Sequence, residues 1–246
     1  MTYCLAIRTR SGIVGIADTR ITSGRETTKA RKLYLHNRDK HSLFIMTSGL
    51  RSVRDKALTY FKEAIAERDE SFNKLYKAVN AFGEQVKRVA DEDKNSIEDA
   101  GYNFDLSALV GGQLEDDDDH KLFMLYPQGN WIEVGEGTPF SIIGNTGYGK
   151  PILDRTINFD SSLEFALKTG FLSFDATRLS SNDVEFPIDV IIYKKDSFNI
   201  VMQRYEKDEL RFISKIWNDS LTEYINNIPD EWMQKVFDKL QERVSN

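Results

Sequence analysis

The sequence is poor in the features that mark secreted and membrane-embedded proteins. Its 246 residues include one cysteine, Cys4, and a single thiol cannot close a disulfide within the chain. We therefore expect the chain to work in a reducing, cytoplasmic compartment. No apolar run approaches the ~18 residues that a membrane span needs. The first residues also lack the basic and then apolar layout of a signal peptide, so we expect no contact with a membrane.

An excess of positive charge and the spacing of a metal site are missing as well. The formal net charge of −6 argues against a nucleic-acid partner. The three histidines, His36, His41 and His120, are scattered along the chain without metal-ligand spacing. Five acidic residues directly precede His120, and we interpret residues 115–119 as a solvated turn at a hairpin tip instead of a cation site. We expect no metal and no cofactor.

What is present is the composition of an ordinary globular protein with a full core, 40% hydrophobic and 29% charged residues. The chain has no internal repeat and no linker rich in proline, glycine or serine, so we expect a single domain over residues 1–246. Alternating and short apolar runs predict strands at 2–7, 13–18, 32–35, 41–47, 104–110, 121–126, 131–134, 141–144, 187–193 and 198–204. Helical spacing predicts helices from residue 52, and at 71–90, 148–156, 161–175, 214–225 and 231–244, with a polar loop at 91–102.

The order of these elements predicts the fold class. Hairpins in two blocks, each followed by a pair of helices, favour two stacked antiparallel sheets with helices on their outer faces. We therefore expect an α+β protein, a four-layer αββα sandwich.

The start of the chain carries a possible catalytic unit. We expect Met1 to be trimmed because Thr2 has a small side chain, and Thr2 then carries a hydroxyl and a free α-amine on neighbouring carbons. The amine, with a reference pKa of about 7.7–8.0, can accept the hydroxyl proton near neutral pH, whereas lysine at about 10.4 cannot. A nucleophile and its own base are thus held together by covalent geometry. Threonine is common at the second position of proteins, so Thr2 alone is weak evidence for catalysis.

Further motifs accompany Thr2. Sixteen residues after it comes the string Asp18-Thr19-Arg20-Ile21-Thr22-Ser23-Gly24, followed by Arg31-Lys32-Leu33, by Thr47-Ser48-Gly49, and later by Tyr148-Gly149-Lys150-Pro151-Ile152-Leu153-Asp154-Arg155. With these motifs the sequence resembles proteasome β-type subunits, which are N-terminal-nucleophile hydrolases. The last segment makes it most similar to their bacterial branch, the Anbu (ancestral beta subunit) family. The resemblance covers nearly the whole chain.

The resemblance implies roles for five residues. Thr2 matches the nucleophile, Lys32 the active-site lysine, and Asp18 the acid that holds this lysine. Gly49 matches the glycine whose N–H stabilises the oxyanion, and Thr22 matches a residue whose backbone pairs with an extended substrate. A cation beside Thr2 would keep its α-amine unprotonated and favour the alkoxide. Each of these residues also has a plain structural interpretation, as a surface lysine, a strand end or a turn glycine.

Two supporting positions depart from the family pattern. Proteasome β-subunits carry a Gly-Ser-Gly turn beside the terminal threonine, whereas here the turn reads Gly144-Asn145-Thr146-Gly147, so that Thr146 or Asn145 stands in for the serine. A later Asp-x-x-Ser-Gly-Gly motif is replaced by a longer segment after Asp175. We predict Asp175 as a supporting residue and do not choose among those that follow it.

The resemblance implies a threonine peptidase that cleaves peptides or unfolded proteins through an acyl-enzyme. Such enzymes are assembled from several identical chains, and Anbu proteins are associated with open or spiral-like rings. An ATPase partner cannot be inferred from one chain. Two alternatives remain open: an amidase or acylase of small metabolites on the same fold, and a non-catalytic assembly subunit. Retention of Thr2, Asp18 and Lys32 argues against the latter.

Overall fold

The computed structural model describes residues 2–23, 26–68 and 72–244. It divides the chain into two compact units, Met1–Lys207 and Asp208–Asn246. The first unit contains the sheets and helices α1 to α4, and the second is helical. That the whole chain forms a single domain stays a prediction.

One sheet of the first unit is built around two strands that are buried along their whole length. Strands β1 (Tyr3–Thr9) and β2 (Gly12–Asp18) form an antiparallel hairpin. The strand order is β10-β1-β2-β11-β12, with β10 at Phe140–Gly144, β11 at Ile188–Lys194 and β12 at Ile200–Tyr205. Because both faces of the central strands are covered, their sequences are nearly continuous apolar runs.

The second sheet is an antiparallel meander with the order β5-β6-β7-β8-β9. Its strands are β5 (Leu33–Arg38), β6 (His41–Gly49), β7 (Leu106–Gln113), β8 (Lys121–Leu125) and β9 (Trp131–Glu133). Consecutive strands along the chain pair with one another. This includes β6 and β7, although two helices lie between them in the sequence.

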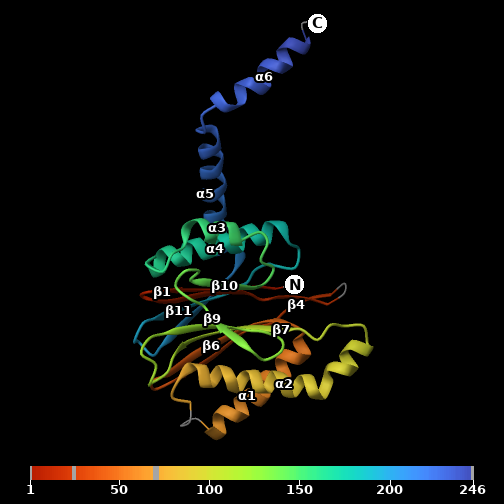
Figure 1. Ribbon diagram of the computed structural model, residues 1–246, viewed down its shortest axis with the longest axis vertical. Helices are drawn as coiled ribbons and strands as arrows, with labels where there is room; N and C mark the ends of the chain where they lie inside the picture. Colours follow the sequence, from red (N-terminus) through yellow and green to blue (C-terminus); the bar gives the residue numbers. More distant parts are fainter. Residues whose placement is uncertain (1, 24–25, 69–71, 245–246) are drawn as a thin grey trace. The chain divides into compact units, whose positions relative to one another are not determined.

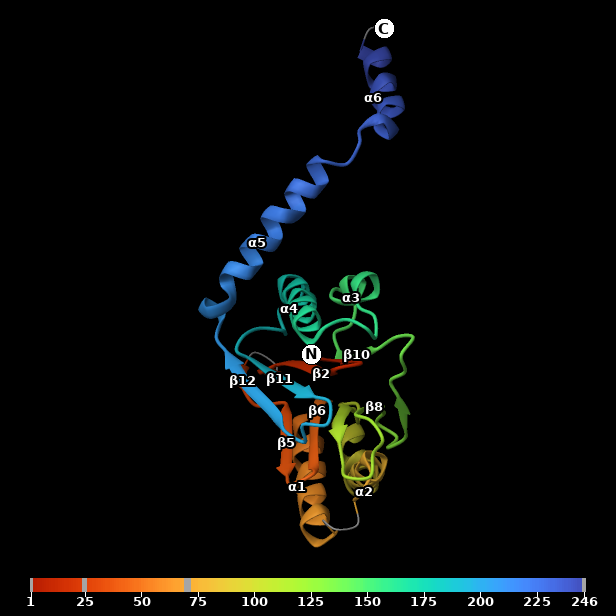
Figure 2. The ribbon, with the colours of Figure 1, turned by 90° about the vertical axis from the view of Figure 1, so that its left-hand side faces the viewer.

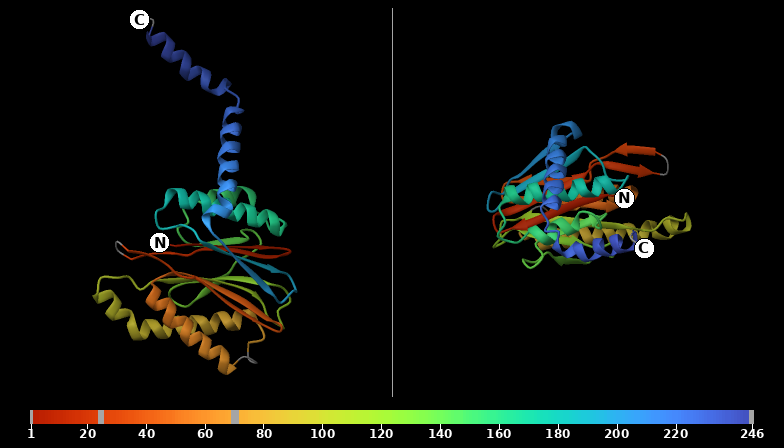
Figure 3. Two further views of the ribbon diagram at one scale, coloured as in Figure 1. Left: turned by 180° about the vertical axis from the view of Figure 1, so that it is seen from behind. Right: turned by 90° about the horizontal axis from the view of Figure 1, so that it is seen from above.

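Helices cover the outer face of each sheet. Helices α1 (Arg51–Arg68) and α2 (Leu75–Asp99) lie below the second sheet, and α3 (Lys150–Thr156) and α4 (Leu163–Ser180) lie above the first (Figures 1 and 2). The view from behind shows the same order of layers (Figure 3). The α+β four-layer αββα sandwich expected from the sequence is confirmed.

The space between the two sheets is filled by apolar side chains. Gly15 of β2 has no room for a side chain, since an added Cβ would lie 2.3 Å from Met46 Cε. Even-numbered residues of β1 point into this space, whereas Leu5 and Ile7 pack against Gly170 of α4 on the other face. The buried residues of the inter-sheet core are Cys4, Ala6, Ile13, Ala17, Leu33, Phe44, Met46, Leu109, Leu122, Val134, Ile143, Ile191, Tyr193 and Ile200.

Helix α2 is longer than the sequence predicts. Residues 91–99, expected to begin a polar loop, continue the helix to Asp99. Four ion pairs line this exposed stretch: Arg88–Glu92 and Lys94–Glu98 at i,i+4 spacing, and Lys56 of α1 with both Glu92 and Asp93. Charged side chains at this spacing stabilise a helix, and Ile97 adds a contact with the apolar core. The polarity of the segment was therefore the wrong criterion.

Two further features were not anticipated. A separate two-stranded ribbon, β3 (Arg20–Ser23) with β4 (Glu26–Lys29), follows β2.

The acidic run at residues 115–119 is also more ordered than the sequence predicts. The Asp117 carboxylate accepts the backbone N–H of Leu75 and of Leu114, and so joins the hairpin tip to the start of α2. The run is therefore only partly the solvated turn that the sequence predicts.

The second unit consists of two amphipathic helices. Helix α5 (Lys207–Asn226) contains no buried residue, and α6 (Glu231–Val244) follows after a short connection. Helix α5 begins seven residues earlier than predicted, whereas α6 has the predicted bounds. In the described part of the chain, no helix combines the length and the apolar character that crossing a membrane requires.

Candidate active site

Backbone contacts on both sides fix Thr2 at the beginning of β1. Its carbonyl accepts the N–H of Asn145 at 2.7 Å, and the next residue, Tyr3, donates its N–H to Asp18 Oδ1 at 2.9 Å. The Tyr3 hydroxyl donates to Ser173 Oγ of α4 at 2.7 Å. Thr2 is 8% exposed, and by strand alternation its side chain points, like that of Cys4, towards the second sheet.

The turn after β10 approaches Thr2 so closely that it requires glycine. Gly144 has φ +90°, and a Cβ added to it would lie 2.0 Å from the Thr2 carbonyl oxygen. Only a residue without a side chain combines this φ with such a close approach. Gly144, which directly precedes the predicted supporting residues Asn145 and Thr146, therefore helps to determine where Thr2 lies.

Asp18 and Lys32 form a buried ion pair next to the first strand. Lys32 Nζ donates to Asp18 Oδ1 at 2.7 Å, and the two residues are 4% and 0% exposed. Asp18 also accepts the N–H groups of Tyr3 and Arg20. Burial raises the pKa of the Asp18 carboxyl, and the Lys32 ammonium and the two N–H donors oppose this rise. The lysine is thereby held in one position, with its charge directed at the start of β1.

The register of β6 directs the Gly49 N–H out of the sheet. The N–H of Leu50 bonds to Asp105 next to β7, whereas the N–H of Thr47 bonds to the carbonyl of Lys32, on the side of β5. Ladder bonds alternate between the two neighbouring strands, so the Gly49 N–H points to the side of β5. Strand β5 begins only at Leu33, and the N–H therefore faces the open end beyond it. Its φ is +128°, again a conformation suited to glycine.

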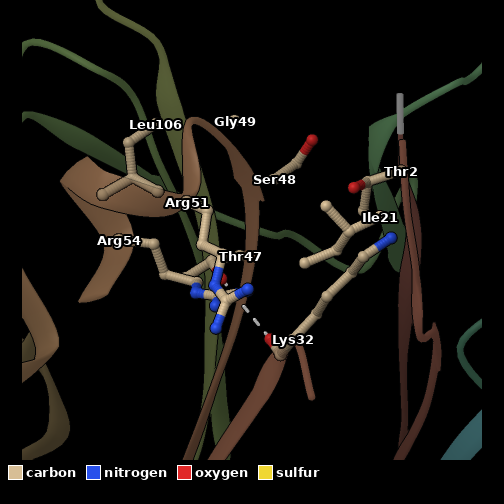
Figure 4. A pocket seen from close by; sticks show the side chains of 9 residues that line it. All are labelled: Thr2, Ile21, Lys32, Thr47, Ser48, Gly49, Arg51, Arg54 and Leu106. Carbon is tan, nitrogen blue, oxygen red and sulfur yellow. Dashed lines mark hydrogen bonds between the residues drawn. The ribbon is translucent and has the colours of Figure 1, made fainter. Parts of the chain in front are cut away.

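These groups meet in one small cavity at the end of the two sheets. The cavity has a volume of about 30 Å³ and is lined by Thr2, Ile21, Lys32, Thr47, Ser48, Gly49, Arg51, Arg54 and Leu106. Figure 4 shows the Lys32 side chain extending towards Thr2 on one wall, with Ser48 and Gly49 on the facing wall. The predicted nucleophile, lysine and oxyanion donor thus border a single space, and Asp18 lies directly behind it.

The remaining predicted residues lie less centrally. Thr22 belongs to β3 and pairs with Thr27, and its side chain lies outside the described residues. Thr146 is exposed in the turn, where the backbone of its neighbour Asn145 makes the contact with Thr2. Asp175 is fully buried on α4, and its Oδ1 accepts two hydrogen bonds from Arg178.

Sequence reasoning missed Ser48, Arg51 and Arg54 as residues of the site. Arg51 and Arg54 belong to the first turn of α1, directly after Gly49. A signal was available: arginines at i and i+3 share one face of a helix, and the preceding glycine was already assigned to the site. What the sequence could not indicate is that this face points to the cavity instead of solvent.

The arrangement is suited to acyl transfer. It combines a hydroxyl at a strand end, a fixed ammonium group and a backbone N–H aimed into the same space, which are the parts that nucleophilic attack on a carbonyl requires. Within the described residues, no three His, Cys, Asp or Glu side chains are grouped so as to hold a metal ion.

Comparisons with known proteins show which solved structures the chain is similar to. No protein-family model and no curated protein matches the chain. The chain is similar to the solved structure of an Anbu (Gly-1) mutant from Hyphomicrobium sp. strain MC1, with 31% identity and a TM-score of 0.85 over 93% of this chain and 98% of the other. Anbu (ancestral beta-subunit) from Yersinia bercovieri is 30% identical with a TM-score of 0.86 over 92% and 98%. A helical assembly of the Anbu complex from Pseudomonas aeruginosa is 29% identical with a TM-score of 0.86 over 92% and 97%.

Proposed function

Since the chain belongs to the Anbu family of proteasome-like peptidases, we propose that it is a threonine peptidase with Thr2 as its nucleophile. The observation that carries the proposal is the shared cavity: Thr2, Lys32 and Gly49 line one space, with Lys32 bonded to the buried Asp18 at 2.7 Å. If Lys32 were only a surface lysine and Gly49 only a turn glycine, their common position beside Thr2 would have no explanation. Burying an ion pair is costly, and it rarely stabilises a fold enough to be explained by stability alone.

The chemistry begins with removal of Met1, because until then the nitrogen of Thr2 is a peptide amide and not a base. The freed α-amine accepts the proton of the Thr2 hydroxyl as the oxygen attacks the substrate carbonyl carbon. The Gly49 N–H stabilises the negative charge that develops on the carbonyl oxygen. The proton then passes to the leaving amine, and an ester joins the acyl group to Thr2. Water, activated by the same amine, hydrolyses the ester and frees the hydroxyl.

Lys32 acts in this scheme as a fixed charge. Its ammonium disfavours a second positive charge on the α-amine and so keeps the amine unprotonated near neutral pH. Asp18 positions Lys32 and, through the Tyr3 N–H, also positions the strand that carries Thr2. Asp175 and the turn at Asn145 and Thr146 support the start of β1 from the side of α4 and β10. The backbone of Thr22 on β3 offers an edge to which an extended peptide can add as a strand.

We further propose that the substrates are peptides or unfolded proteins and that identical chains assemble in the cytoplasm. The helical assembly of the Anbu complex from Pseudomonas aeruginosa supports an assembly of this kind. The exposed apolar side chains of α5 and α6 supply surface for contacts between chains.

Intact-protein mass spectrometry with and without a peptide electrophile that reacts with terminal threonines tests the proposal. We expect the mass of the chain without Met1, and an adduct that peptide mapping places on Thr2. Cys4 provides an internal control, because burial raises the pKa of its thiol and keeps it unreactive. Thr2→Ala abolishes the adduct, and Thr156→Ala, which changes an exposed threonine of α3 that does not line the cavity, retains it.

The outcomes separate the alternatives. A chain that keeps Met1 and never forms the adduct would be a non-catalytic assembly subunit. An adduct on Thr2 together with turnover of small amides and no cleavage of longer peptides would identify an amidase. Cleavage of a denatured protein by the wild type, lost in Thr2→Ala, supports the peptidase.

A further inference from the structure

We propose that the cavity beside Thr2 selects substrates with an acidic side chain on the residue whose carbonyl is attacked. The inference rests on the proposed function, since it names the substrate class of the same site. It arises from two residues that the chemistry above does not use, Arg51 and Arg54. Both line the cavity that Thr2 and Gly49 border.

The position of the arginines follows from the start of α1. Gly49 ends β6 and α1 begins at Arg51, so the helix begins immediately beside the N–H that faces the cleft. Arg51 and Arg54 are three residues apart and share a helix face. Figure 4 shows their guanidinium groups converging near Thr47, on the wall opposite Thr2. When a carbonyl carbon sits at Thr2 and its oxygen points to Gly49, the side chain attached next to that carbonyl enters this space.

The charges of this wall do not cancel. One carboxylate, Asp55, serves both arginines: Arg51 Nε donates to it at 3.3 Å, and Arg54 Nε and Nη2 donate at 2.8 and 2.7 Å. Lys32, the other cation of the cavity, is already paired with Asp18. Two guanidinium groups and one carboxylate leave a net positive charge beside the cavity.

Among the residues that the structure describes, the hydrogen bonds of the two guanidinium groups leave several of their donors unused. Each carries five N–H donors, and the bonds to Asp55 use one donor of Arg51 and two of Arg54. A substrate carboxylate can accept the others, and charge-assisted bonds of this kind are about twice as strong as neutral ones. Arg54 is only 8% exposed, so solvent screens its charge less than that of a surface arginine.

The size of the cavity points in the same direction. The space beside Thr2 is small, about 30 Å³, and the two arginines form part of its wall. A carboxylate in this space can accept hydrogen bonds from the guanidinium groups, whereas a leucine side chain would leave these donors unpaired. A lysine side chain would meet a like charge.

Peptides that differ only at the residue before the cleaved bond test the inference. The set carries Glu, Asp, Gln, Leu or Lys at this position, both as cleavable substrates and as electrophiles that label Thr2. Gln is the matched comparison for Glu because it has the same shape without the charge. Because a charge-assisted hydrogen bond is about twice as strong as a neutral one, we expect kcat/KM or the labelling rate for Glu to exceed that for Gln by roughly 10- to 100-fold. Lys is expected to be the poorest.

Variants locate the effect. Arg51→Gln and Arg54→Gln each reduce the ratio of Glu to Gln rates towards one. Asp55→Asn removes the competing carboxylate and raises the ratio. Arg88→Gln, which removes an exposed arginine of α2 that does not line the cavity, leaves it unchanged. Arg51 is exposed, so we expect Arg51→Gln to fold normally. This variant still tests the inference if Arg54→Gln impairs folding.

The results that overturn this inference differ from those that overturn the proposed function. Equal rates for Glu, Gln and Leu, or a preference for Lys, refute acidic selection while Thr2 remains the nucleophile. A Glu preference that persists in both arginine variants also refutes it. Absence of any adduct on Thr2 with every probe refutes the proposed function itself, and the selection with it.

Discussion

Asp18 links the two halves of the candidate catalytic unit. One of its oxygens accepts both the Lys32 ammonium and the backbone N–H of Tyr3, and the other accepts the N–H of Arg20. The position of the lysine and that of the strand behind Thr2 therefore depend on a single buried carboxylate. A change in either partner of the Asp18–Lys32 pair should therefore affect the stability of the fold and the reactivity of Thr2 together.

Removing one partner of the buried pair should destabilise the fold strongly. In Lys32→Met the Asp18 carboxylate stays buried without its ammonium partner. Breaking a buried ion pair costs about 3–5 kcal/mol, and we expect a decrease of this order in the free energy of unfolding, measured by urea denaturation. Labelling of Thr2 is lost as well, because the fixed positive charge is absent.

The double variant separates the two effects. Asp18→Asn with Lys32→Met removes both charges, so we expect it to recover part of the stability while labelling stays absent. An equally stable Lys32→Met variant that still labels Thr2 at the wild-type rate would show that the pair serves neither purpose.

The turn after β10 allows a comparison between two glycines three residues apart. Gly144→Ala places a Cβ 2.0 Å from the Thr2 carbonyl oxygen at a φ of +90°, whereas a Cβ on Gly147 meets nothing closer than 4.0 Å. Strained backbone of this kind costs about 1–3 kcal/mol, and the clash displaces Thr2. We expect Gly144→Ala to lower both the melting temperature and the labelling rate. Gly147→Ala should change neither, and equal effects at the two glycines would contradict the close approach as the cause.

At the scale of the elements, local patterns predicted most of the strands and helices, because apolar runs and helical spacing reflect which face is buried. The errors lie where apolar burial contributes little. Residues 91–99 remain helical through ion pairs, and the β3–β4 ribbon has too little apolar sequence to be recognised. In the site, Thr2, Lys32 and Gly49 were predictable by resemblance. Arg51 and Arg54 were not, since their role depends on the direction in which the first turn of α1 leaves β6.

Two buried tyrosines on central strands of the first sheet make the free energy of unfolding decrease at alkaline pH. Burial raises the pKa of Tyr193 to about 12 and raises that of Tyr3 further, whereas an unfolded tyrosine ionises near 10. Between these values the unfolded chain has released protons that the folded chain still holds, so stability falls as pH rises. We expect this decrease to begin near pH 10 and to be smaller in Tyr193→Phe.

Absorbance of tyrosinate measures the same effect directly. Of the ten tyrosines, Tyr3 and Tyr193 should ionise only together with the loss of folded structure seen by circular dichroism. Ionisation of all ten near pH 10 in a protein that remains folded would contradict the burial of these two hydroxyls.

At the scale of the whole molecule, the site exists only because distant segments meet. The start of β1, the end of β2, the residue before β5 and the end of β6 come from two different sheets, and the turn after β10 closes the arrangement. No window of the sequence contains these contacts, since the ion pair spans 14 residues and the contact of Asn145 with Thr2 spans more than half of the chain. Resemblance to a family could supply the roles, but only the stacking of the sheets supplies the distances.

The second unit leads to a prediction about assembly. Its helices expose large apolar side chains, with Trp232, Val236 and Leu240 at i, i+4 and i+8 on one face of α6 and 71%, 63% and 57% exposed. Burying a side chain of this size stabilises a contact by about 1.5–3 kcal/mol. If this face joins identical chains, Trp232→Glu weakens association by roughly 10- to 100-fold and shifts the mass measured by sedimentation towards the monomer. Gln234→Glu introduces the same charge at an exposed polar position of the same helix and should leave the mass unchanged. An unchanged assembly in Trp232→Glu would place the contacts between chains on the first unit instead.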